Sequence, residues 1–82
     1  MRVWVVTINC HYDADMVGGV YSNKALAGHA VMEMINYRYC ALEMYYEYVT
    51  DMWDDGITFT IETVNQENQT TWYKIEPVTL NA

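Results

Sequence analysis

Residues 22–53 have the sequence SNKALAGHAVMEMINYRYCALEMYYEYVTDMW, which contains no proline and one glycine. Within it, large apolar and aromatic residues recur at steps of three or four, at Val31, Ile35, Tyr39, Leu42, Tyr46, Val49 and Trp53. These steps follow one face of an α-helix. The hydroxyl of Ser22 can cap the first turn, and Gly56 can end the helix in the left-handed conformation. The pattern therefore predicts a helical region over residues 22–53.

The predicted helix is long for the chain that contains it. One helix over residues 23–53 would span about 46 Å, whereas a domain of this size has a radius of gyration of roughly 12 Å. We expect the helix to break near residues 36–40, so that it becomes two helices. The alternative is one helix whose overhang is covered by a second copy of the chain.

Four segments outside the helical region are predicted to be β-strands, and residues 57–64 show the clearest alternation of apolar and polar side chains. The predicted strands cover residues 2–11, 17–21, 57–64 and 70–76. Turns are expected at residues 54–56 and 65–69, and Pro77 ends the last strand or sets it at an edge. The order β-β-α-β-β, with the helix whole or broken in two, predicts an α+β fold in which the helical region packs on one face of a small antiparallel sheet.

The chain has 82 residues, which make one domain over residues 1–82 with a modest core. The alternating faces of the strands and the helical pattern predict which side chains share that core. The predicted core residues are Trp4, Val6, Ile8, Val31, Ile35, Leu42, Phe59 and Ile61.

An acidic pattern overlaps the helical one. Glu43, Glu47, Asp51 and Asp55 are four residues apart, with Asp54 beside them, and on a helix they would form one row of repelling charges. No lysine or arginine lies between Arg38 and Lys74 to neutralise that row. Three tyrosines accompany the acids, at Tyr37, Tyr45 and Tyr48. A solvated face is one interpretation. A binding surface for a basic partner is the other, and the tyrosines favour it because tyrosine is enriched at interfaces.

The overall charge points the same way. A net charge of −7 disfavours direct contact with nucleic-acid phosphates or with an anionic membrane surface. It suits a protein partner with a basic surface. The N-terminal apolar run is too short for a signal peptide or a membrane span, so we expect a cytoplasmic protein whose two cysteines are reduced.

No pattern of catalytic or cofactor-binding residues stands out. Cys10, His11, His29 and Cys40 do not have the spacing of a zinc site. The aspartates near residues 13–15 and 51–55 lack the alternation of a calcium loop. No phosphate loop or dinucleotide fingerprint is present. We therefore expect no metal, no cofactor and no enzymatic activity.

The opening residues MRVWVVT, followed by Gly19-Val20-Tyr21-Ser22 and the alanines at positions 27 and 30, resemble the start of many small phage-encoded proteins. In those proteins a strand leads to a Gly-Val-Phe/Tyr-Ser segment and an alanine-containing helix. The resemblance covers about the first 35 residues and implies a viral accessory protein. Small acidic phage proteins are often inhibitors of host defence, including anti-CRISPR-like inhibitors, so it also implies that class.

These observations lead to one functional hypothesis and two alternatives. The hypothesis is a non-enzymatic inhibitor that binds a basic, nucleic-acid-handling host protein through its acidic, tyrosine-rich surface. The first alternative is a binder or sponge for a small ligand or nucleotide signal at a dimer interface. The second is a structural accessory protein with no inhibitory role. Rings on more than one face of the helix further predict a homodimer or a tight complex with another protein.

Overall fold

The computed structural model describes residues 1–10, 15–41, 48–65 and 67–80, with the side chains of all of these except residues 37–41. In chain order the elements are β1 (Arg2–Cys10), β2 (Met16–Tyr21), α1 (Lys24–Ala41), β3 (Tyr48–Asp54), β4 (Phe59–Val64) and β5 (Thr70–Thr79). The predicted α+β class is confirmed. So is the order of two strands, a helix and two further strands, to which the structure adds β3 between α1 and β4.

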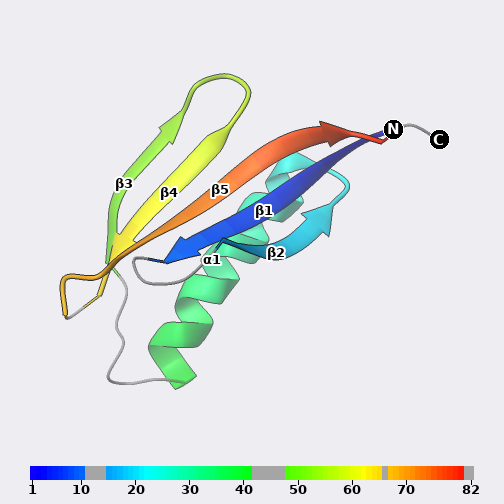
Figure 1. Cartoon of the computed structure of the whole chain (residues 1–82). Coiled ribbons are helices and arrows are strands. Elements are labelled where there is room, and N and C mark those ends of the chain that lie inside the picture. The colour runs from blue at the N-terminus through cyan, green and yellow to red at the C-terminus, as the bar shows by residue number, and fades with distance from the viewer. Residues whose placement is uncertain (11–14, 42–47, 66, 81–82) are drawn as a thin grey trace.

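The strands form one antiparallel sheet in the order β2-β1-β5-β4-β3. β1 and β5 pair over their full shared length, from Arg2 opposite Thr79 to Cys10 opposite Thr71. This pairing brings Met1 beside Leu80, whose backbone groups are hydrogen-bonded to each other, next to the paired ends of β1 and β5 in Figure 1. β2 and β3 are the two edges of the sheet. α1 packs on one face against β1, β2 and β5 and leaves the opposite face open (Figure 1).

The core lies between α1 and this covered face. The register places Ile75 opposite both Val6 and Phe59, and Tyr73 opposite both Ile8 and Ile61, so that three adjacent strands present apolar side chains at the same level. The buried cluster consists of Val6, Ile8, Ala27, Val31, Ile35, Ile61, Tyr73 and Ile75.

Most of the predicted core is confirmed, and two of its members need correction. Trp4 and Phe59 are only partly buried and pack against the edge of the cluster. Their rings lie below the ammonium of Lys24, whose Nζ is 5.8 Å from the Trp4 ring centroid and 5.9 Å from that of Phe59. Both rings therefore lie at the margin of the core, within cation–π distance of Lys24. Leu42 lies outside the described residues.

The start of α1 is capped one residue later than predicted. Oδ1 of Asn23 accepts a hydrogen bond from the backbone N–H of Leu26 at 2.8 Å, which is the geometry of an N-cap residue. Asn23, rather than Ser22, therefore satisfies the first turn. The helix buries Ala27, Val31 and Ile35, which are four residues apart, as one helical face requires.

The prediction that the helical region extends to residue 53 is wrong. Residues 48–54 form β3, and α1 is continuous from Lys24 to Ala41 with no break at residues 36–40. Tyr48, Val49, Thr50 and Trp53 have aromatic or β-branched side chains, which fit a pleated strand better than a helix. A strand also relieves the carboxylates of this segment from an unfavourable place at a helix C-terminus.

Both predicted turns are confirmed. Gly56 has the left-handed conformation expected of it, with φ of 94°, but it lies in the β3–β4 turn rather than after a helix. In the β4–β5 turn, Oδ1 of Asn65 accepts bonds from the backbone N–H groups of Glu67 and Gln69, both at 2.9 Å. The side chain of Asn65 thus closes the hairpin that pairs the two strands.

Candidate functional site

The open face of the sheet presents a row of side chains that crosses four strands. Trp53 of β3 is opposite Thr60 of β4, Thr60 is opposite Lys74 of β5, and Lys74 is opposite Thr7 of β1. Because side chains alternate between faces along a strand, every second neighbour of these residues also points away from α1. Trp72 and Glu76 therefore flank Lys74 on the same face.

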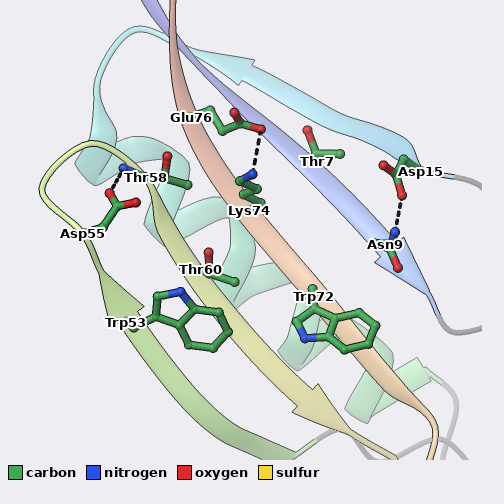
Figure 2. A pocket seen from close by; sticks show the side chains of 10 residues that line it. All are labelled: Thr7, Asn9, Asp15, Trp53, Asp55, Thr58, Thr60, Trp72, Lys74 and Glu76. Atoms are coloured by element: carbon green, nitrogen blue, oxygen red, sulfur yellow. Dashed lines mark hydrogen bonds and ion pairs between the residues drawn. The ribbon is translucent and has the colours of Figure 1, made fainter.

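These side chains line a shallow groove with a volume of about 630 Å³. Figure 2 shows the two indole rings at one end of the groove, Glu76 at the opposite end, Lys74 between Glu76 and the rings, and the β3–β4 turn at one side. The lining residues are Thr7, Asn9, Asp15, Trp53, Asp55, Thr58, Thr60, Trp72, Lys74 and Glu76. Trp53 is 44% exposed, so a large apolar ring is available at the surface of the groove.

Trp72 is held in place by a carboxylate on β4, the strand next to the sheet edge. Its indole N–H donates to Oε1 of Glu62 at 3.1 Å. Oε2 of the same carboxylate accepts a bond from the hydroxyl of Thr50 at 3.1 Å. The chain of bonds runs across β3, β4 and β5, so the orientation of the Trp72 ring is fixed before any ligand arrives.

Three carboxylates and one ammonium line the groove. Nζ of Lys74 lies 3.8 Å from Oε1 of Glu76, which is a loose ion pair. Asp15 accepts a hydrogen bond from the side-chain amide of Asn9. The third carboxylate belongs to Asp55, in the β3–β4 turn. The groove therefore carries a surplus of negative charge beside its two aromatic rings.

The β3–β4 turn is organised by two of these acids. Oδ1 of Asp55 accepts bonds from the backbone N–H groups of Ile57 at 2.9 Å and Thr58 at 2.7 Å. The bonds from Thr58 and Ile57 lower the pKa of the Asp55 carboxyl below its ordinary value. Asp55 is therefore anionic at neutral pH with its geometry fixed by the turn, and its second oxygen is left to accept other donors.

Asp54 points to the other face of the sheet and is neutralised there. Its Oδ2 lies 2.5 Å from Nζ of Lys24, at the start of α1, and its Oδ1 accepts a bond from the N–H of Gly56 at 2.8 Å. The bond to Lys24, followed by that to Gly56, lowers the pKa of Asp54. The sequence has no lysine or arginine near this acidic segment, and the fold brings Lys24 to Asp54 from 30 positions away.

The predicted partner-binding residues do not form one helical row. Tyr48, Asp51 and Asp54 lie on β3, and Asp55 follows it in the turn. Asp51 is exposed on the edge strand β3, and Asp55 lines the groove. Four members of the predicted set cannot be placed: Glu43, Tyr45 and Glu47 lie outside the described residues, and so does the side chain of Tyr37.

The edge strand β3 is exposed along its whole length, yet it is a poor template for another strand. The register shifts between Val49 and Asp51, which leaves Thr50 as a bulge. Oδ1 of Asp51 accepts a bond from the backbone N–H of Met52 at 2.8 Å, which occupies that amide. Bulges and charged side chains protect sheet edges from pairing with other chains. We therefore expect a partner to contact β3 through its side chains rather than through backbone pairing.

Several groove residues were not identified from the sequence. Alternation in residues 70–76 already placed Trp72, Lys74 and Glu76 on one face, but nothing in the pattern showed that they meet Trp53. Trp53 was assigned to the apolar face of the predicted helix. The signal that could have found the groove is a pair of tryptophans on two strands whose other face is apolar.

Comparison with protein-family models, with curated proteins and with solved structures yields no match for this chain. Among the residues that the structure describes, no helix has the length and apolarity that a membrane crossing requires. The same described ranges contain no group of three or more His, Cys, Asp or Glu side chains placed to hold a metal ion.

Proposed function

We propose that this chain is a non-enzymatic protein-binding module that attaches to a basic surface of another protein through the open face of its sheet and the adjoining strand β3. The observation that carries the proposal is the groove itself: two tryptophan rings on an acidic sheet face that α1 does not cover. The partner we expect is a nucleic-acid-handling host protein, whose activity would be inhibited when its basic surface is occupied.

Charge supports this choice of partner. The chain has 11 acidic residues against 4 lysines and arginines. Of the cations with described side chains, Lys24 and Lys74 are already paired with Asp54 and Glu76. A protein with this balance approaches basic partners faster than neutral ones, because opposite charges steer encounter.

Aromatic side chains support the location of the contact. Tryptophan and tyrosine are the residues that most often anchor protein interfaces when they are desolvated. Trp53 and Tyr48 are exposed on β3, and Trp72 is half-buried with a fixed ring. Rigid rings lose little conformational entropy on binding, so they suit the role of anchors.

The expected origin and location of the protein rest on the sequence. The resemblance of about the first 35 residues to small phage-encoded proteins supports a viral accessory protein that acts in the host cytoplasm. It also supports inhibition of host defence as the outcome of binding.

Affinity capture from host lysate tests the proposed function. The parent chain should recover a basic protein in stoichiometric amount. Trp53→Ala should lose that protein, whereas Leu26→Ala, on the exposed side of α1, should retain it. Recovery of no stoichiometric partner, or equal recovery with both variants, would contradict the proposed function or its location.

A small-ligand binder is the second candidate, because the volume of the groove falls within the ~300–1,000 Å³ range of ligand sites. The acidic lining disfavours nucleotides, whose phosphates need basic partners. Native mass spectrometry of the purified protein separates the two candidates, since a bound small molecule would add a defined mass that denaturation removes.

A further inference from the structure

The groove combines three features that together select one type of side chain. It has an exposed indole face at Trp53, a second indole locked by Glu62, and carboxylates at Asp55 and Glu76. The methylene groups of a long cationic side chain can pack on an indole while its charged end remains at a polar site. Carboxylates further along the groove can then accept the hydrogen bonds of that charged end.

Acceptor capacity remains on both carboxylates. Asp55 uses Oδ1 for the backbone of its turn, which leaves Oδ2. Glu76 meets Lys74 through Oε1 at a distance of 3.8 Å, which leaves Oε2 and a loose contact that another donor can replace. In Figure 2 these two acids lie on either side of Thr58, at the end of the groove opposite the indoles.

The geometry favours a guanidinium over an ammonium. A guanidinium is planar and its fork of N–H groups can bond to two carboxylates at once, whereas an ammonium is compact and strongly hydrated. The groove is elongated along β5, from Trp72 to Glu76, which suits a long side chain that passes over the ring before its charged end meets an acid.

We propose that the groove holds an arginine side chain of the partner, with its apolar stem across the Trp53 indole and its guanidinium hydrogen-bonded to the carboxylates of Asp55 and Glu76. This inference rests on the proposed function, because it names the anchor of the basic partner. The ammonium of Lys74 repels other cations. A cation therefore binds in the groove only if its hydrogen bonds to the Asp55 and Glu76 carboxylates outweigh that repulsion.

The test uses the purified chain and three short Gly-Ser peptides of equal length, with a central arginine, lysine or citrulline. Binding is followed through the indole N–H resonances, with that of Trp53 assigned from Trp53→Phe. The arginine peptide should shift the Trp53 signal in a saturable way, and citrulline, which is neutral, should bind at least about fivefold more weakly.

Two substitutions sharpen the result. Trp53→Ala should weaken binding of the arginine peptide by about two- to fivefold, because the apolar contact between the ring and the stem of the arginine is lost. Lys74→Met should tighten it by on the order of twofold, because a repelling charge is removed. Leu26→Ala, outside the groove, is the control and should change nothing.

Three results would overturn the inference: equal binding of arginine and citrulline peptides, weaker arginine binding by Lys74→Met, or saturable shifts of Trp53 with inorganic phosphate but not with the arginine peptide. The proposed function has a separate test. One combination of results separates the two proposals: the captured partner is lost with Trp53→Ala, but the arginine peptide does not shift the indole resonance of Trp53. That combination would support the proposed binding surface and contradict the arginine anchor.

Discussion

Replacement of Ile61 by alanine should remove much of the stability of this fold. Ile61 is 1% exposed and packs in the buried cluster between α1 and the sheet. The change deletes three carbons, and at about 0.8 kcal/mol per buried methylene the loss of transfer free energy alone is about 2.4 kcal/mol. The unfilled cavity adds to this, so we expect a decrease in the free energy of unfolding of about 3 kcal/mol, within the range of roughly 2–5 kcal/mol for such changes.

Urea unfolding followed by circular dichroism measures this loss directly. With a slope of about 1 kcal/mol per molar urea, the midpoint should fall by about 3 M. Ile57→Ala is the matched control, because the same residue type is 65% exposed in the β3–β4 turn, and its effect should stay within about 0.5 kcal/mol. Equal losses in the two variants would refute the assignment of Ile61 to the core.

Three further predictions concern the ion pair, the fixed ring and self-association. The pKa of Asp54 is lowered in the folded state, chiefly by its bond to Lys24. The ionised carboxylate therefore stabilises the fold at pH values above its unfolded pKa of about 3.9. This contribution is lost as the pH falls through the folded pKa. Urea midpoints measured across that acid range should therefore fall less steeply for Asp54→Asn than for the parent. Glu62→Ala should release the indole of Trp72 and speed exchange of its N–H with solvent, as NMR can measure, whereas Glu62→Gln should preserve much of the bond. Sedimentation velocity at micromolar concentration should show a homodimer, because apolar side chains are exposed at both sheet edges; a clean monomer without partner would reject that expectation.

The fold class could be predicted because strand alternation and helix spacing are local signals. The face of β1 that carries Val6 and Ile8 and the face of β4 that carries Ile61 were both assigned correctly from alternation. Val31 and Ile35 were likewise assigned from their four-residue spacing. Each of these assignments needs only the identities of near neighbours in the chain.

The extent of the helix could not be predicted from spacing alone. Val49 and Trp53 continue the three-to-four residue steps of the preceding segment, yet they lie on β3. On β3 the two residues point to opposite faces, because Val49 is opposite Thr63, Trp53 is opposite Thr60 and the bulge at Thr50 lies between them. Spacing alone therefore does not distinguish a helix from a bulged strand. The free edge of β4 decides between them, and that edge exists only in the folded chain.

The site depended still more on long-range contacts. The neutralisation of Asp54 by Lys24 joins residues 30 positions apart, and the meeting of Trp53 with Trp72 and Lys74 requires the register of three strands. The partner-binding residues predicted from the sequence include one groove residue, Asp55, and the rest of that set stays a prediction. The sequence pattern did not reveal the groove, because a groove is a property of strand order rather than of any segment.

The central claim is that the open sheet face, rather than the exposed side of α1, contacts a basic partner. Hydroxyl-radical footprinting tests this claim most directly, with the chain measured alone and bound to the partner recovered by capture. Trp53 and Met32 are both oxidisable and are exposed to similar extents. Trp53 lies on the open face of the sheet, whereas Met32 lies on α1, which covers the other face. We predict that the partner protects Trp53 from oxidation and leaves Met32 unchanged. Protection of Met32 with Trp53 unchanged would contradict the account.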